Sequence, residues 1–307
     1  MIQEDVARAP IRSKIDLADA YEQVQVHPMD VDKTAFSTIA GTFMSHVVQQ
    51  GDCNTPATFQ QLMTSIFRDV IGKFLHVYLD YIFIYSQTVD KHEKHVRIVF
   101  ERLRDSHFYL KWKKCDLYAE KVDCLGHIID DEGIHPDADK LGRIREWRTP
   151  HNYNNVQRFI GLVNYVSNFL PNITAYTALL QSMMQNRALF FWRPLHQRCF
   201  EMIKHICYKT LVIRPLDYKL DEPVWLICDV SKTGVGAMYG QGPSWTRCRP
   251  ARFMSKKFTH AQQHYVVHEL EALLKWEDKL IGRKVHVITD HKVLEFFKTQ
   301  ARLSNRQ

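Results

Sequence analysis

The first third of the chain alternates between short apolar runs and polar segments, and this pattern predicts several strands. Residues 12–16 are predicted to form a short strand. Residues 34–39 and 43–48 are predicted to form two more strands around a turn at residues 40–42. Apolar runs of this length, bounded by polar residues and glycine, are typical of strands in a mixed sheet.

An amphipathic helix is predicted after Asn54 and Thr55, because Pro56 suits the first turn of a helix and Gly72 suits its stop. Apolar side chains recur at helical spacing between these limits, which indicates one buried face. They are Phe59, Leu62, Met63, Ile66, Phe67 and Val70. A second helix of this kind is predicted at residues 90–106, where the buried face would carry Val96, Val99, Phe100 and Leu103.

A tight hairpin is predicted between the two helices, from a strand at residues 75–80 and an apolar run at 82–85. Asp80 lies at its tip. A charged side chain in such hydrophobic surroundings is costly unless another group compensates it. A bound metal ion would do so, and so would an arginine or the donors of a turn, so Asp80 alone leaves these explanations open.

The rest of the chain divides into two further parts. The segment from residue 135 to about 185 is predicted to be helical and basic, and a new domain is predicted near Asp217. That domain would begin with a strand at residues 224–228, followed by a glycine-rich turn at Gly234, Gly236 and Gly240. We therefore expect an α+β (mixed α/β) protein with parts at residues 1–134, 135–216 and 217–307.

The composition is that of a globular protein with room for more than one core, since 45% of the 307 residues are hydrophobic and 24% are charged. No apolar run approaches the roughly 20 residues needed to span a bilayer, and the N-terminus lacks a signal peptide. The seven cysteines include no C-x-x-C pair, which argues against a zinc site or a disulfide framework and favours an intracellular, reducing compartment. The net charge of +7 suits a polyanionic partner.

Sequence motifs in a fixed order give a more specific indication. They are Lys14-Ile15-Asp16-Leu17, Lys33-Thr34-Ala35-Phe36, the run from Gln50 to Gln60, Val77-Tyr78-Leu79-Asp80, Lys114-Cys115 and Cys124-Leu125-Gly126-His127. In this order and spacing, the chain resembles the Pol polyprotein of gypsy-type LTR retrotransposons, especially fungal ones. The resemblance implies a reverse transcriptase palm, thumb and connection helices, and then an RNase H-like domain.

The resemblance also implies roles for single residues of the polymerase-like part. Asp16 and Asp80 would be catalytic metal ligands, because two carboxylates can hold a pair of Mg²⁺ ions, or Mn²⁺ in their place, for phosphoryl transfer. Tyr21 would lie under the nucleotide sugar, unless it is an ordinary core tyrosine. Gln50 and Gly51 would line the pocket for the incoming nucleotide, unless they only form a turn before the helix.

Three more residues of this part have implied roles. Leu125 and Gly126 would grip the end of the primer; the simpler explanation is a turn at a strand edge. Lys114 would lie near the triphosphate, although a solvated lysine is an equal alternative.

The last third resembles an RNase H domain. Its catalytic metal ligands would be Asp229, Glu271 and Asp290, and two of them, Asp229 and Asp290, follow apolar strands. Capping of a turn is the alternative for both aspartates. The glutamate is ambiguous between Glu269 and Glu271, because the helix that carries them is about six residues, or roughly 9 Å, shorter than in the family.

The implied partners are an RNA template, a DNA primer, an RNA–DNA hybrid and deoxynucleoside triphosphates. A set of basic residues in the thumb-like part would track a phosphate backbone, or would form a solvated helix face: Lys140, Arg143, Arg145, Arg148 and Arg158. No pattern in the sequence indicates an oligomeric state.

Four departures from the family reduce the expected activity. Tyr81 replaces the second aspartate of the hairpin, the start lacks the fingers segment, the RNase H helix is short, and the RNase H fold is incomplete at the end. Three hypotheses follow: an active reverse transcriptase with ribonuclease H, an inactive nucleic-acid-binding remnant, and a remnant that binds only proteins. We expect very weak or no polymerase activity.

Overall fold

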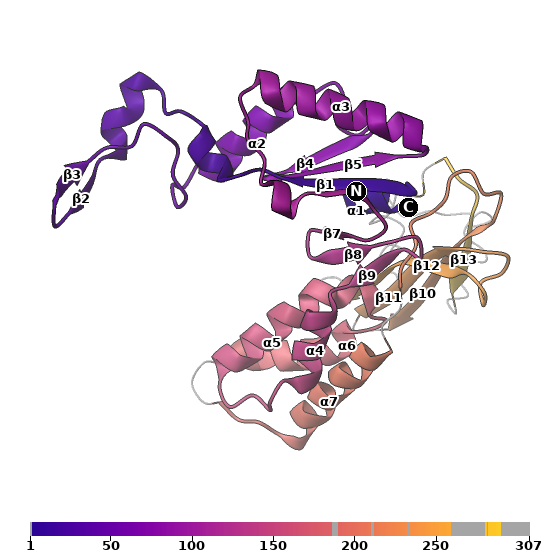
Figure 1. Ribbon diagram of the computed structural model, residues 1–307. Helices are drawn as coiled ribbons and strands as arrows, with labels where there is room; N and C mark the ends of the chain where they lie inside the picture. Colours follow the sequence, from indigo (N-terminus) through magenta and orange to yellow (C-terminus); the bar gives the residue numbers. More distant parts are fainter. Residues whose placement is uncertain are drawn as a thin grey trace, which may run out of the picture. The chain divides into compact units, whose positions relative to one another are not determined.

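The computed structural model describes residues 2–185, 190–209, 212–231, 234–258, 280 and 282–289. The chain falls into two compact units (Figure 1). The first comprises Met1–Leu125 and Ile129–Asp131, and the second Gly126–Ile128 and Glu132–Gln307. Each unit is described separately below.

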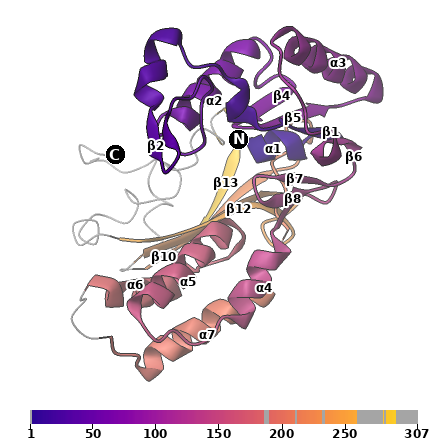
Figure 2. The ribbon, with the colours of Figure 1, turned by 60° about the vertical axis from the view of Figure 1, so that its left-hand side comes forward.

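The first unit is built on an antiparallel sheet with the strand order β4-β5-β1-β6. The strands are β1 (Ile11–Asp16), β4 (Leu75–Tyr78), β5 (Tyr81–Ser86) and β6 (Asp116–Ala119). The helices are α1 (Ile2–Ala7), α2 (Thr55–Ile66) and α3 (Val89–Asp105), of which α2 and α3 cover one face of the sheet (Figures 1 and 2). The hydrophobic core lies between these layers, so the predicted hairpin and both predicted helices are confirmed.

Two local predictions for this unit are wrong. The strands around Gly41 are shorter than predicted, with β2 at Phe36–Thr38 and β3 at Gly41–Phe43, because a 3₁₀ helix occupies Pro28–Thr34. Helix α2 ends at Ile66, well before Gly72. Gly72 instead has a positive φ of 80° in the turn that leads to β4, a conformation that suits glycine.

A small sheet follows β6 in the sequence. Its strands are β7 (Val122–Cys124), which belongs to the first unit, β8 (His127–Ile129) and β9 (Ile134–Pro136). The predicted helical segment therefore starts at α4 (Ala138–Glu146) and continues with α5 (Tyr153–Val166), α6 (Thr174–Ser182) and α7 (Pro194–Tyr208). These four helices share one core, centred on buried side chains such as Phe159 and Phe200.

The last part of the second unit is a sheet with the strand order β12-β11-β10-β13. Its strands are β10 (Val224–Ser231), β11 (Gly234–Gln241), β12 (Arg249–Lys257) and β13 (Val285–Thr289), and β13 runs parallel to β10. The predicted glycine-rich turn is in fact strand β11. Its glycines permit close packing, because a Cβ on Gly240 would collide with the carbonyl oxygen of Arg249, and one on Gly234 would meet that of Lys256 at 2.7 Å.

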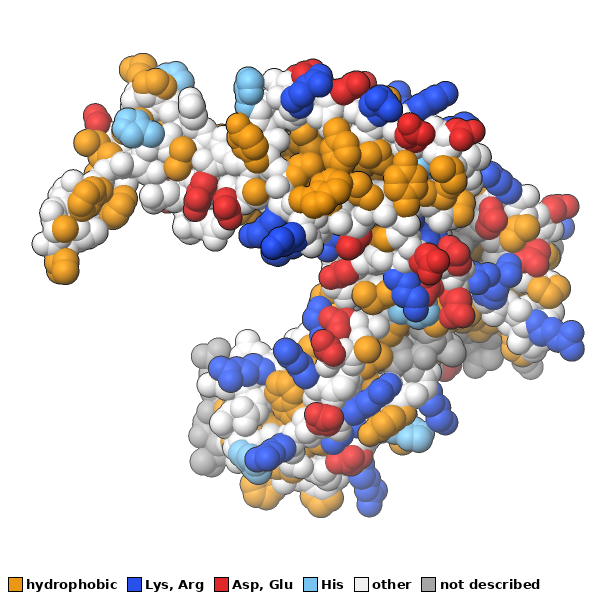
Figure 3. All heavy atoms as spheres, in the orientation of Figure 1, with side chains coloured by type: hydrophobic (Ala, Val, Ile, Leu, Met, Phe, Trp, Pro, Cys, Tyr) orange, Lys and Arg blue, Asp and Glu red, His pale blue; other side chains and the backbone are white. Residues whose placement is uncertain are grey.

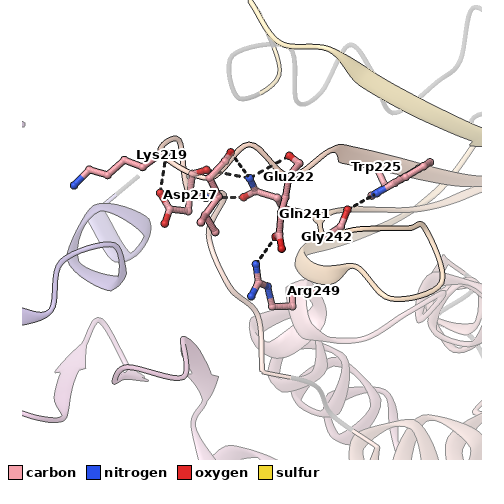
Figure 4. Close-up of polar contacts among 8 residues, drawn as sticks. Asp217, Lys219, Glu222, Trp225, Gln241, Gly242 and Arg249 are labelled. Carbon is pink, nitrogen blue, oxygen red and sulfur yellow. Dashed lines mark hydrogen bonds and ion pairs between the residues drawn. The ribbon is translucent and has the colours of Figure 1, made fainter.

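The side chain of Gln241 forms hydrogen bonds with the loop that precedes this sheet (Figure 4). Its buried side chain donates to the carbonyl oxygen of Asp217 at 3.0 Å and accepts from the backbone N–H of Asp217 at 2.8 Å. Arg249 adds an ion pair to Glu222 at 2.6 Å. These contacts hold the loop before β10 to the end of β11.

Apolar side chains gather beside α3 on the surface of the first unit (Figure 3). A groove of about 810 Å³ lies here, lined by residues that include Phe100, Tyr109 and Trp112. Tyr109 and Trp112 are 72% and 66% exposed. None of the described helices is long and apolar enough to cross a membrane.

Candidate active sites

Asp16 and Asp80 lie together at one end of the sheet of the first unit. Asp16 is the last residue of β1, and Asp80 lies in the two-residue turn between β4 and β5. The backbone N–H of Leu17 donates to the carbonyl oxygen of Asp80 at 3.1 Å. The register of β1 on β5 thus brings the two predicted carboxylates together from distant parts of the sequence.

The surroundings of this carboxylate pair favour a cation. Burial raises the pKa of Asp80, and the neighbouring Asp16 raises it further. Asp16 is itself only 6% exposed. Lys114 compensates part of the charge, with its Nζ 3.9 Å from Oδ2 of Asp16. Lys14 also lowers the pKa of Asp80, so two ammonium groups act on the pair, and the two carboxylates offer the oxygen ligands that a divalent metal ion prefers.

The turn that carries Asp80 has an unusual backbone. Leu79 has a φ of +53°, whereas Asp80 does not have a positive φ, which is the pattern of a type II′ turn closed by Tyr78 and Tyr81. Glycine usually occupies the position of Leu79, and a side chain there is strained by roughly 1–2 kcal/mol. Strain of this kind persists only where the surroundings enforce the conformation.

Gln60 on α2 enforces it. The Oε1 of Gln60 accepts from the backbone N–H of Leu79 at 2.8 Å, and its Nε2 donates to the carbonyl oxygen of Val77 at 3.3 Å. No sequence pattern predicts this role for Gln60, because its distance from Leu79 along the chain gives no indication of the contact. The one signal in the sequence is its place in the run from Gln50 to Gln60.

Tyr81 lies directly beside the carboxylates, opposite Asp16 in the ladder. Burial raises the pKa of its phenol, and Asp80 and Asp16 raise it further. The Nζ of Lys14 lies 4.6 Å from the centre of the ring. The phenol therefore stays neutral at physiological pH and supplies no charge to balance a metal ion.

The predicted nucleotide-binding residues differ in how close they come to this centre. Tyr21 packs edge-on against Phe59, with ring centres 5.3 Å apart. Burial raises the pKa of Tyr21, and so, to a smaller extent, does the charge of Asp80. Gln50 and Gly51 are exposed, and no contact joins them to Asp16 or Asp80 in the described structure.

The predicted primer grip forms a second strained turn. Leu125 and Gly126 join β7 to β8 and have φ values of 55° and 78°, as in a type I′ turn. Within the second unit, the hydroxyl of Tyr165 and the Nζ of Lys140 lie against Gly126, where a Cβ would collide with both. The Lys140 Nζ also lies 3.5 Å from the centre of the Tyr165 ring. The positive φ and this close approach both favour glycine at position 126.

The five basic residues predicted to contact a phosphate backbone divide into two groups. Lys140 contacts Tyr165 and pairs with Asp137 at 3.3 Å, and Arg145 donates to the carbonyl oxygen of Cys207 at 2.7 Å. These two side chains thus have partners within the unit. The other three are exposed, namely Arg143, Arg148 and Arg158.

In the RNase H-like part, the structure describes only one of the predicted carboxylates. Asp229 is exposed and lies within β10 rather than at its end. Its neighbour Cys228 pairs with Thr289 of β13. Glu269, Glu271 and Asp290 lie outside the described residues. Within the described ranges, no group of three histidine, cysteine, aspartate or glutamate side chains is arranged to hold a metal ion.

Two family models match the chain. Residues 2–129 match the reverse transcriptase (RNA-dependent DNA polymerase) family, and residues 219–307 match the RNase H-like domain found in reverse transcriptase. Among curated proteins, the transposon Tf2-7 and Tf2-3 polyproteins of Schizosaccharomyces pombe are both 28% identical over 292 residues, or 92% of this chain. The chain spans 22% of the length of these relatives.

Solved structures show the same fold. The foamy viral protease-reverse transcriptase in complex with dsDNA matches all of this chain and 64% of its own length, with a TM-score of 0.82 and 22% identity. Its complex with an RNA/DNA hybrid matches 99% of this chain and 42% of its own length, with a TM-score of 0.78 and 22% identity. These matches confirm the predicted mixed α/β fold of a reverse transcriptase.

The two domain matches occur in the same order as in the predicted polyprotein, and the fungal transposon relatives extend across both of them. The chain therefore carries a domain of the reverse transcriptase family followed by an RNase H-like domain of the kind found in reverse transcriptases, and it is similar in sequence to transposon polyproteins of fission yeast.

Proposed function

We propose that the reverse transcriptase domain is an RNA-directed DNA polymerase with a weakened metal site formed by Asp16 and Asp80. The observation that carries this proposal is the pairing of these two carboxylates at the end of the sheet. Polymerases of this type depend on clustered carboxylates, because phosphoryl transfer needs divalent cations to offset the charge on the attacking and leaving oxygens.

The side chains present fit one divalent cation better than two. Asp16 and Asp80 supply the oxygen ligands that Mg²⁺ and Mn²⁺ prefer, and burial together with the neighbouring Asp16 raises the pKa of Asp80. A bound cation would supply charge neutralisation at the reacting phosphate. Tyr81 adds no carboxylate, so we infer that a second cation is held poorly and that polymerisation is very weak.

Other residues of the chain would bind the substrates. Tyr21, which packs edge-on against Phe59, would support the sugar of an incoming deoxynucleoside triphosphate. Gln50 and Gly51 would line the same pocket. The rigid turn at Leu125 and Gly126 would hold the primer end. The exposed Arg143, Arg148 and Arg158 would contact the phosphates of a template–primer duplex.

The RNase H-like domain would cleave the RNA strand of an RNA–DNA hybrid. Asp229 would be one of its catalytic carboxylates, and we keep Glu271 and Asp290 as the proposed partners, with Glu269 as the alternative to Glu271. Clustered carboxylates are needed here for the same reason as in the polymerase site, because the domain must hold divalent cations beside a phosphate.

The second candidate function is duplex binding without catalysis. The observation that favours it is the neutral phenol of Tyr81 beside the carboxylates. The foamy viral reverse transcriptases of the same fold were solved with an RNA/DNA hybrid and with dsDNA. A chain that kept this fold and its exposed arginines would still bind a duplex.

A primer-extension assay with Mg²⁺ or Mn²⁺ on an RNA template tests the proposal. We expect slow extension, stronger with Mn²⁺, that disappears with Asp16→Asn. Asp19→Asn is the matched control, because Asp19 is exposed and its positive φ suits asparagine. Robust extension would contradict the weakened site. No extension together with salt-sensitive duplex binding would favour the second candidate.

A further inference from the structure

The segment that follows α3 returns to the end of β1, where Asp16 lies. The backbone N–H of Lys111 donates to the carbonyl oxygen of Asp16 at 2.9 Å, and that of Ala18 donates to the carbonyl oxygen of Tyr109 at 3.0 Å. These two hydrogen bonds form one isolated antiparallel bridge beyond the end of β1. The segment is thus paired with the backbone on both sides of the Asp16 peptide group and its successor.

An exposed stretch of this segment carries Lys114 to the carboxylates. Leu110 and Cys115 pack against the core, and the four residues between them are all exposed. Three of these four form a short 3₁₀ helix, Trp112–Lys114. Lys114 nevertheless lies beside the carboxylate pair, with its Nζ 3.9 Å from Oδ2 of Asp16. The course of the exposed stretch therefore depends on the polar contacts where it leaves the bridge.

Gln23 supplies such contacts with one side chain. Its Oε1 accepts from the backbone N–H of Tyr109 at 2.6 Å, and its Nε2 donates to the carbonyl oxygen of Tyr109 at 3.1 Å. The same Nε2 donates to the carbonyl oxygen of Ala18. A primary amide offers one acceptor and two donor hydrogens, so Gln23 pairs with both backbone groups of Tyr109 in the way that a neighbouring strand would. Gln23 thus joins the two chain segments of the bridge.

We propose that Gln23 is a positioning residue that keeps Lys114 beside Asp16 and thereby limits how strongly the carboxylate pair binds a divalent cation. The inference rests on the proposed metal site. An ammonium group this close to Asp16 repels a cation that approaches the same carboxylate. Lys114 has this effect while its segment is held along the end of β1, and the contacts of Gln23 hold it there.

Hydrogen exchange of backbone amides, measured by NMR on the full chain, tests the positioning without any metal. We expect Gln23→Ala to speed exchange at Lys111, which Gln23 does not itself contact, because the bridge to Asp16 then opens more often. The amide of Val99, in the buried part of α3, should be unaffected, which excludes general unfolding. Gln25→Ala removes the same kind of side chain from an exposed position and is the matched control. Unchanged exchange at Lys111, or equal acceleration by both variants, would overturn the proposal.

A double-mutant cycle tests the link to the cation. Lys114→Gln should raise Mn²⁺ affinity several-fold in a calorimetric titration, because it removes a positive charge next to Asp16. The same change should have a smaller effect when Gln23→Ala is already present, because Lys114 is then no longer held at the carboxylate. Lys113→Gln removes the same charge from an exposed lysine that forms no ion pair with a described residue, and it should change the affinity less.

Failure of the metal site and failure of the positioning role give different results. If Mn²⁺ binds to none of these proteins, the proposed metal site is wrong, and exchange at Lys111 still decides whether Gln23 positions the segment. If Mn²⁺ binds but Lys114→Gln has the same effect with and without Gln23→Ala, the metal site stands and the role of Gln23 is excluded.

Discussion

The side-chain oxygen of Gln60 accepts a hydrogen bond from the backbone N–H of Leu79 at 2.8 Å. Helix α2 thereby holds the strained turn that presents Asp80. Gln60 also donates to the carbonyl oxygen of Val77 on the preceding strand, so one side chain makes two hydrogen bonds to the segment just before Asp80. The position of a candidate metal ligand thus depends on a neutral residue that would not itself contact the metal.

We expect Gln60→Ala to lower the free energy of unfolding by about 1–2 kcal/mol, because the Leu79 N–H loses its partner. It should also weaken Mn²⁺ binding, since the Asp80 turn is no longer fixed. Urea denaturation and a Mn²⁺ titration would measure the two effects. Gln61→Ala is the control, because Gln61 is exposed on the same helix. Equal losses in both variants would contradict the role of Gln60.

Tyr81→Asp should strengthen divalent-cation binding. The added carboxylate would increase the ligand charge, which we expect to raise Mn²⁺ affinity on the order of tenfold. Without metal, the same change should lower the melting temperature, because three carboxylates then repel one another. Calorimetric titration and thermal denaturation with and without Mn²⁺ would measure this. The gain should vanish when Asp16→Asn is added; if it survives, Asp16 is not a ligand.

His92 should make the first unit sensitive to acid. It is fully buried, with Nε2 2.7 Å from the Ser13 hydroxyl and Nδ1 2.8 Å from the Ser86 hydroxyl. Burial, with a smaller effect of the nearby His95, lowers the pKa of His92 to about 4. An unfolded histidine has a pKa near 6.5, so the unfolded chain binds the proton first and gains stability as the pH falls.

The contribution of His92 is therefore present above about pH 6.5 and is lost progressively towards pH 4. We expect a loss of about 2 kcal/mol between pH 7 and pH 5 from this group. Urea denaturation across this range would measure it. His92→Gln should reduce the slope, whereas His107→Gln, at an exposed position, should leave it unchanged. The same slope in all three proteins would exclude His92 as the cause.

Gly126→Ala should destabilise the protein by about 3 kcal/mol, because the new Cβ collides with Tyr165 and Lys140 and Gly126 has a positive φ. Adding Tyr165→Phe should recover part of this loss by removing the hydroxyl. The control is Gly142→Ala in α4, where a Cβ has open space and should stabilise the helix by up to about 1 kcal/mol. Additive effects of the first two changes would show that the hydroxyl does not cause the clash.

The strands nearest the candidate site could be predicted because their apolar runs end at clear polar residues, as at Asp16 and Asp80. The motif order also identified both domains. Predictions failed where the backbone follows tertiary packing. Three closely spaced glycines predict a turn around Gly236, but this segment is a strand. The sequence does not reveal the close approach of Asn172, which leaves no room for a Cβ at Gly236. The contact between Gln60 and Leu79 likewise joins helix α2 to the turn between β4 and β5, and tertiary packing rather than local sequence brings them together.

The proposed domain limits at residues 134 and 216 stay a prediction. The roles given to Asp229, Glu271 and Asp290 also stay predictions, and the last two lie outside the described residues.

Tyr81 is a strand residue, and its backbone is held by the ladder between β1 and β5. A change of side chain there can remove a carboxylate and leave the hairpin intact. Evolution can thus erase catalysis in a copy of a mobile element with little effect on whether the copy folds. Selection against misfolding would not detect such a loss. Inactive copies would therefore persist as well-folded proteins, so a preserved palm does not by itself distinguish an active polymerase from an inactive descendant.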